Sequence, residues 1–148
     1  MIGKIEPADA LKVALADTFA FYLKAHNFHW NVTGPSFAEY HGFFGGLYDE
    51  VQGGVDVIAE GIRTLDSFAP VSLTSLLPLA TLDESGTIPD GLTMLKTLKN
   101  DNDKVLAQML KVYDEANTSG EIGIANLLQT RIEAHEKHGW MLRSITKA

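Results

Sequence analysis

Apolar residues recur at three- and four-residue spacing over long stretches of this 148-residue chain, whereas alternating, strand-like patterns are scarce. This period is typical of amphipathic helices, so the pattern predicts a mainly helical protein. Pro7 suits a first helical turn, and Gly34-Pro35 ends that helix. Ser36 followed by Glu39 predicts a capping box at the start of the next helix. The four long helices are expected at about residues 7–32, 36–65, 92–115 and 122–145.

The segment 66–91 between the second and third helices carries Pro70, Pro78 and Pro89, which break any long helix. Its apolar leucines still predict one short helix near Leu73 to Leu77. Two helical pairs joined by a long crossover are the ferritin-like form of the four-helix bundle. We therefore expect an all-α, ferritin-like four-helix bundle with a short helix in the crossover, forming a single domain over residues 1–148.

The charge balance disfavours nucleic acid and anionic membranes as partners. Twelve basic against 19 acidic side chains give a net charge of −7, and the basic residues are not concentrated anywhere. Acidic residues interrupt the N-terminal apolar positions, and no run of 18 apolar residues occurs. We therefore expect neither a signal peptide nor a membrane span, and a cytoplasmic location.

The chain contains no cysteine, which excludes disulfides, thiolate metal sites and cysteine nucleophiles. Any bound metal must then be held by His, Asp or Glu. These ligands favour iron or another ion that prefers oxygen and imidazole.

The second helix carries two carboxylates on the side away from its apolar face. On a wheel of roughly 100° per residue, Asp56 and Glu60 fall opposite the core positions. Those core positions are Leu47, Val51, Val55, Ile58, Ile62 and Leu65. Gly42, Gly46 and Gly53 lie on nearly the same side as the acids, although each glycine within a helix costs about 1 kcal/mol relative to alanine. This face is interpreted as a subunit interface, and a solvated face is the alternative.

Two histidines complete a candidate site. His29 lies near the end of the first helix and His41 near the start of the second, so an antiparallel hairpin brings them to one end of the molecule. Asp56 is 15 residues beyond His41, roughly 22 Å along the helix. A two-fold axis would bring the histidine end of one chain to the carboxylate end of its partner. Two imidazoles and two carboxylates suit ferrous iron. Packing or hydrogen bonding is the expected role of the other histidines, His26, His135 and His138.

The chain resembles the Dps family of miniferritins over essentially its whole length. The resemblance rests on HNFHWNVTGPSF at 26–37, His41, DVIAE at 56–60 and EKHGWML at 136–142. It implies a hollow shell of twelve subunits, in which iron is oxidised at inter-subunit sites, commonly by hydrogen peroxide, and stored as ferric mineral. On that pattern, one subunit contributes His29 and His41. Its partner contributes Asp56 and Glu60, and the family places aromatics near the site at positions matching Trp30 and Trp140.

Ordinary ferritins hold a di-iron centre within one bundle by Glu-x-x-His pairs, and this sequence contains no such pair. The chain also departs from the Dps pattern. Many relatives carry an acid where Gly45 stands, which can help hold a second iron. The usual arginine after the Ala-Glu pair is Gly61, and Arg63 is a possible substitute for its salt bridge.

Three functions are therefore considered. The leading hypothesis is a ferroxidase and iron-storage subunit, an oxidoreductase that removes ferrous iron and peroxide. It rests on the four spaced ligands. The second is a DNA-coating stress protein, which only the family likeness suggests and the acidic balance opposes. The third is a structural assembly without metal chemistry, suggested by Gly45 and Gly61.

Overall fold

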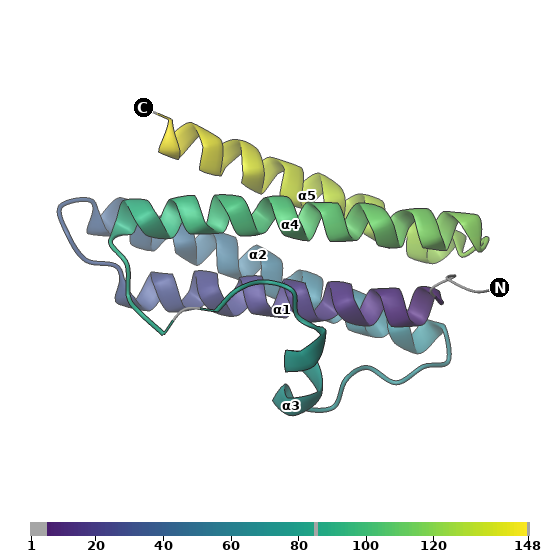
Figure 1. The fold of residues 1–148 in the computed structure, drawn as a ribbon. Coiled ribbons are helices and arrows are strands. Elements are labelled where there is room, and N and C mark those ends of the chain that lie inside the picture. Colours follow the sequence, from purple (N-terminus) through teal and green to yellow (C-terminus); the bar gives the residue numbers. More distant parts are fainter. Residues whose placement is uncertain (1–5, 85, 148) are drawn as a thin grey trace.

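The computed structural model describes residues 6–84 and 86–147, and four long helices dominate this part of the chain (Figure 1). The predicted all-α fold with a short helix in the crossover is confirmed. The elements are α1 (Pro7–Asn31), α2 (Phe37–Thr64), α3 (Leu73–Leu76), a 3-10 turn η1 (Leu77–Leu79), α4 (Gly91–Thr118) and α5 (Ile122–Thr146).

The four long helices form two hairpins that pack on each other. α1 pairs with α2 and α4 pairs with α5, while α1 also packs along α4. The crossover from α2 to α4 runs along the bundle (Figure 1). The short helix α3 lies on the α1 side of the bundle and projects outward from it. This arrangement places the α1–α2 turn and the start of α4 at one end of the bundle, with the α4–α5 turn at the other.

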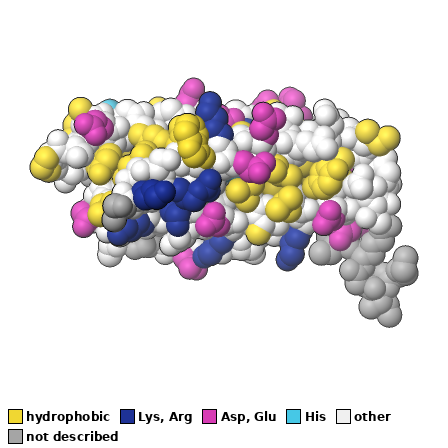
Figure 2. All heavy atoms as spheres, turned by 90° about the horizontal axis from the view of Figure 1, so that it is seen from above, with side chains coloured by type: hydrophobic (Ala, Val, Ile, Leu, Met, Phe, Trp, Pro, Cys, Tyr) yellow, Lys and Arg dark blue, Asp and Glu magenta, His cyan; other side chains and the backbone are white. Residues whose placement is uncertain are grey.

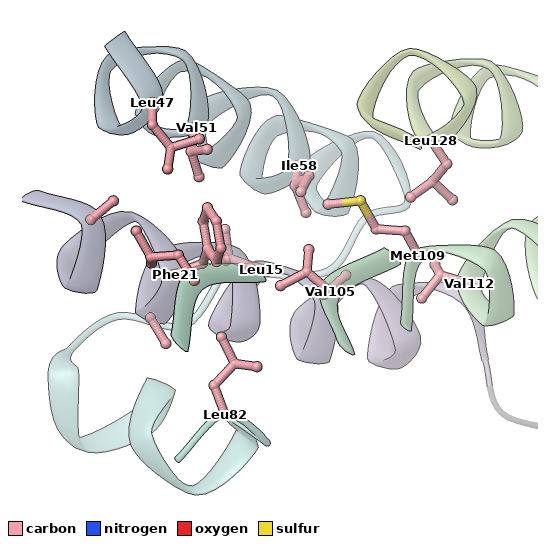
Figure 3. Close-up of a cluster of buried hydrophobic side chains, with 14 of the residues drawn as sticks. Leu15, Phe21, Leu47, Val51, Ile58, Leu82, Val105, Met109, Val112 and Leu128 are labelled. Carbon is pink, nitrogen blue, oxygen red and sulfur yellow. The ribbon is translucent and has the colours of Figure 1, made fainter. Parts of the chain in front are cut away.

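Apolar faces of all four long helices and one crossover residue form the core (Figure 3). Phe21 of α1, Met109 of α4 and Leu128 of α5 are fully buried. The core face expected for α2 is confirmed. Its buried members are Leu47, Val51, Ile58 and Ile62, and its partly buried members are Val55 and Leu65.

The helix starts differ in how they are capped. The capping box expected at Ser36 and Glu39 is wrong, because the Ser36 side chain makes no capping hydrogen bond. Ser36 has φ −97° and ψ 18°, whereas a capping residue normally needs extended backbone to direct its oxygen at the first turn. A capping box forms instead at Ser72 and Ser75 in α3. Asp90 caps α4 by accepting a hydrogen bond from the backbone N–H of Thr93 at 2.8 Å.

Buried polar contacts hold the crossover on the bundle. The fully buried carboxylate of Asp17 accepts hydrogen bonds from Thr81, at 2.6 Å from its backbone N–H and 2.7 Å from its hydroxyl. Lys24 pairs with Asp101 at 2.6 Å and donates to the backbone carbonyl of Asp83 at 2.6 Å. These contacts join α1, α4 and the crossover into one unit.

Candidate metal centre

His29 and His41 lie against each other at the α1–α2 end of the bundle. Their rings stack with centroids 3.8 Å apart and planes inclined by 17°. Nδ1 of His29 lies 2.7 Å from the backbone carbonyl oxygen of His41, and Nδ1 of His41 lies 2.7 Å from the carbonyl oxygen of His29. The hairpin predicted from the sequence therefore brings the two imidazoles together.

This reciprocal pairing decides which ring nitrogen is available. A carbonyl oxygen only accepts hydrogen bonds, so Nδ1 of each ring carries the proton and donates. In the neutral form of each ring, Nε2 then keeps its lone pair. Metal-binding histidines commonly donate their other N–H to a backbone carbonyl or carboxylate, which fixes the ring and raises the basicity of the ligating nitrogen. Both rings thus have the orientation and tautomer of a prepared pair of nitrogen ligands.

Asp56 and Glu60 lie further along α2, and both are exposed, as the helical wheel predicted. The glycines expected on their side, Gly42, Gly46 and Gly53, are exposed too, and a Cβ at any of them would meet no atom within 4 Å. Within residues 6–84 and 86–147, no three His, Asp or Glu side chains are grouped to hold a metal ion. The subunit therefore brings the two histidines together and leaves the two acids apart from them.

Three residues mark the departures from the Dps pattern: Gly45, Gly61 and Arg63. A Cβ at Gly45 would lie 3.2 Å from Cε1 of His29, so a side chain there would require the ring to shift by a few tenths of an ångström. A Cβ at Gly61 would lie 2.9 Å from a methyl group of Leu127. Arg63 donates to the carbonyl of Ser67 at 3.0 Å, and its guanidinium lies over the Phe68 ring. Arg63 is thus engaged at the end of its own helix.

An aromatic group surrounds the histidine pair. His26, one turn before His29, stacks on Tyr48 of α2 with ring centroids 3.8 Å apart. Its Nδ1 lies 3.0 Å from the hydroxyl of Tyr22. Burial and the neighbouring His29 lower the pKa of His26. Trp30 lies 4.1 Å from His26 by ring centroids and is 57% exposed.

A second polar cluster, which the sequence did not reveal, lies between α2, α4 and α5. Arg131 donates to Glu50 through both terminal nitrogens, at 2.6 and 3.1 Å, and His138 Nε2 lies 2.6 Å from the same carboxylate. His135 makes contacts with Asn102 at 2.8 Å and with Arg131 at 3.1 Å. The expectation that His26, His135 and His138 are packed or hydrogen-bonded is confirmed.

The spacing of this cluster is the one signal that could have revealed it. Arg131, His135 and His138 stand four and three residues apart, the spacing of a helix face, between the buried residues Leu128 and Leu142.

The contacts within this cluster also lower the pKa values of two of its members. The hydrogen bond from His138 and the contacts with Arg131 lower the pKa of Glu50 to about 2, despite its partial burial. Burial and the positive charge of Arg131 lower the pKa of His135 to about 3.

Comparisons with known proteins agree with this architecture. A family model for the ferritin-like domain matches residues 8–148. A DNA protection during starvation protein of Brevibacillus brevis is 30% identical over 130 residues, covering 88% of this chain and 87% of that protein. The chain belongs to the Dps family of ferritin-like proteins. A Dps crystal structure from Vibrio cholerae O1 has a TM-score of 0.91 at 30% identity, covering 95% of this chain and 89% of that one.

A further relative also matches most of this chain. An uncharacterized low-temperature-induced protein of Nostoc sp. is 33% identical over 135 residues, covering 88% of this chain and 74% of that protein. None of the helices in the described part of this Dps chain is long and apolar enough to cross a membrane. On the face that is uppermost in Figure 1, basic and acidic side chains lie interspersed among apolar ones (Figure 2).

Proposed function

We propose that this Dps-family chain is a ferroxidase subunit. It oxidises ferrous iron with hydrogen peroxide at sites formed between two copies, and it stores the ferric product inside a hollow shell of twelve subunits. The observation that carries the proposal is the reciprocal hydrogen bonding of His29 and His41, which leaves both Nε2 atoms ready to bind a metal. The Vibrio cholerae relative is described as a member of a broad superfamily of ferritin-like diiron-carboxylate proteins, which supports iron as the substrate.

The separation of the ligands favours a site between subunits. Asp56 is 15 residues beyond His41 on one continuous helix, a rise of roughly 22 Å. No single subunit can place both on one ion at that separation. A two-fold axis across the outer face of α2 would join His29 and His41 of one subunit to Asp56 and Glu60 of the partner subunit. The open glycines on that face would allow the two α2 helices to approach closely.

The four ligands suit the chemistry of iron oxidation. Neutral imidazoles bind ferrous iron, and carboxylates stabilise the greater charge of ferric iron more strongly. Two nitrogen and two oxygen ligands leave coordination positions for water or an oxidant. The chain's part in the reaction is therefore to bind and orient ferrous iron and to favour its oxidised state.

Mixing two inactive variants tests the shared site. One variant carries His29→Ala and His41→Ala, and the other carries Asp56→Ala and Glu60→Ala. Each alone is expected to consume ferrous iron and peroxide no faster than a protein-free control. Random pairing gives mixed dimers in half of the cases, each with one intact site, so co-expression in equal amounts should restore about one quarter of the wild-type sites.

The control is Asp103→Ala, which removes an exposed acid from α4 and should leave ferroxidation at the wild-type rate. Size-exclusion chromatography with light scattering shows that each variant still assembles. Assembled mixtures without any recovered activity would contradict a site shared between subunits. Full activity in either parent variant would contradict the assigned ligands.

A further inference from the structure

Tyr22, His26 and Tyr48 form a stack of three aromatic side chains beside the histidine pair. Tyr22 and His26 are one turn apart on α1, and Tyr48 reaches them from α2. The His26 and Tyr48 rings are nearly parallel, 3.8 Å apart and inclined by 5°. The Tyr22 and Tyr48 ring centroids are 6.3 Å apart. The Tyr22–His26–Tyr48 stack is half-buried, and both tyrosines pack against the core.

The stack borders the proposed iron ligands. The Tyr48 ring centroid lies 5.1 Å from that of His29, and the His26 centroid lies 6.1 Å from it. A continuous path of aromatic rings therefore runs from His29 through Tyr48 and His26 to Tyr22. Each step is only a few ångströms, which is short for electron transfer between rings.

The Tyr22 hydroxyl has a base within hydrogen-bonding distance, because Nδ1 of His26 lies 3.0 Å away. A phenol gives up an electron at an accessible potential only if its proton leaves with the electron, since a protonated phenoxyl radical is a very strong acid. In the tautomer that leaves Nδ1 of His26 unprotonated, the Tyr22 hydroxyl donates to it and has such a route for its proton. The Tyr22–His26 contact therefore has the geometry that the loss of an electron together with a proton requires.

The electron count of the proposed reaction gives this donor a role. Hydrogen peroxide takes two electrons to become water, whereas one ferrous ion gives one. The four proposed ligands form one iron site, and Gly45 next to His29 supplies no further oxygen ligand. Peroxide that receives only one electron releases a hydroxyl radical.

We propose that Tyr22 supplies the second electron, through the Tyr22–His26–Tyr48 stack, when peroxide oxidises iron at His29 and His41. One ferrous ion becomes ferric, and the Tyr22 phenol becomes a neutral phenoxyl radical as its proton moves to Nδ1 of His26. Peroxide takes these two electrons and two protons from solvent, and two molecules of water form. The inference rests on the proposed ferroxidase function.

Rapid-freeze electron paramagnetic resonance tests the inference. Wild-type protein with one ferrous ion per site and excess peroxide should show a tyrosyl radical. Tyr22→Phe should abolish the signal, while His26→Phe, which keeps a ring for stacking but removes the base, should reduce it severalfold. Tyr113→Phe, which changes a tyrosine of α4 outside the stack, is the matched control and should keep the signal. Spin trapping should detect severalfold more hydroxyl radical from Tyr22→Phe than from wild type.

The outcomes separate this inference from the proposed function. Wild-type protein that oxidises iron without a tyrosyl signal, or a signal that survives in Tyr22→Phe, would overturn the role of Tyr22 and leave the ferroxidase intact. Wild-type protein that oxidises no iron would overturn the ferroxidase. In that case, flash oxidation of the metal-free protein by photoexcited ruthenium bipyridyl and persulfate tests the donor itself. A tyrosyl radical that decays severalfold faster in His26→Phe supports the Tyr22–His26 pair, and equal lifetimes reject it.

Discussion

Replacing Gly54 with alanine should destabilise the protein, although alanine normally favours a helix. Gly54 is a buried residue of α2 that faces the guanidinium of Arg131. A Cβ there would lie 2.4 Å from Cζ, 2.5 Å from Nε and 2.7 Å from a terminal nitrogen of that group. Normal contact requires the guanidinium to move by about 1 Å.

The cost depends on whether the guanidinium can move. Arg131 is only 5% exposed, and Glu50 holds its two terminal nitrogens at 2.6 and 3.1 Å. Overpacking costs about 1–3 kcal/mol, and breaking a buried pair costs about 3–5 kcal/mol. The Glu50 side chain is 39% exposed, so the loss of this pair lies below that range. After the helix-propensity gain of about 1 kcal/mol, we expect a net loss of about 2–3 kcal/mol.

Urea unfolding followed by far-ultraviolet circular dichroism measures this loss, at one fixed subunit concentration because assembly contributes to stability. Gly123→Ala is the matched control, since a Cβ at that exposed position of α5 meets nothing within 4 Å. It should be neutral or slightly stabilising. Adding Arg131→Met to Gly54→Ala should cost less than the sum of the two single changes, because the clash has been removed. A Gly54→Ala protein as stable as wild type would show that the guanidinium is not held in place by Glu50.

Three further predictions concern acid stability, the crossover and DNA. The folded-state pKa values of His135 (about 3, from 6.5) and Glu50 (about 2, from 4.5) are both depressed, so the stability that they contribute is present above the unfolded values. The contribution of His135 is lost as pH falls from 6.5 toward 3, and that of Glu50 as pH falls from 4.5 toward 2. His135→Gln should therefore make the midpoint of urea unfolding fall less steeply between pH 6.5 and 3. A midpoint that falls as steeply as in wild type would contradict this prediction. Asp17→Ala removes two buried hydrogen bonds to Thr81, so it should lower the free energy of unfolding by about 2–3 kcal/mol and speed proteolysis within residues 66–90. Cleavage at the wild-type rate would show that these bonds do not hold the crossover on the bundle. The net charge of −7 predicts no gel retardation of DNA at low salt, and retardation at micromolar protein would reject this.

The sequence predicted the helices well because their signals are local. The period of apolar residues located all four long helices, and the broken segment before Leu92 located the crossover. The proximity of His29 and His41 also followed, because a short turn between two helices leaves little choice. The error at Ser36 arose where a capping motif was present but the backbone did not adopt the extended conformation that capping needs.

The Glu50–Arg131–His138 contacts could not be predicted in the same way. They depend on how far α5 slides along α2, which side-chain packing decides after the helices form. The pairing of Gly54 with Arg131 is visible only once that register is known. Likewise, the reciprocal hydrogen bonds of the histidine pair depend on ring orientations that helical spacing does not specify.

All of the proposed iron chemistry requires one iron ion to be held by side chains from two subunits. A crystal of the assembled protein soaked in ferrous iron, with anomalous scattering recorded at the iron absorption edge, locates that ion. We predict one strong peak bonded to Nε2 of His29 and His41 and to the carboxylates of Asp56 and Glu60 of the partner subunit. Peaks only at other residues, or these four side chains without a common point between neighbouring subunits, would rule out the shared iron site.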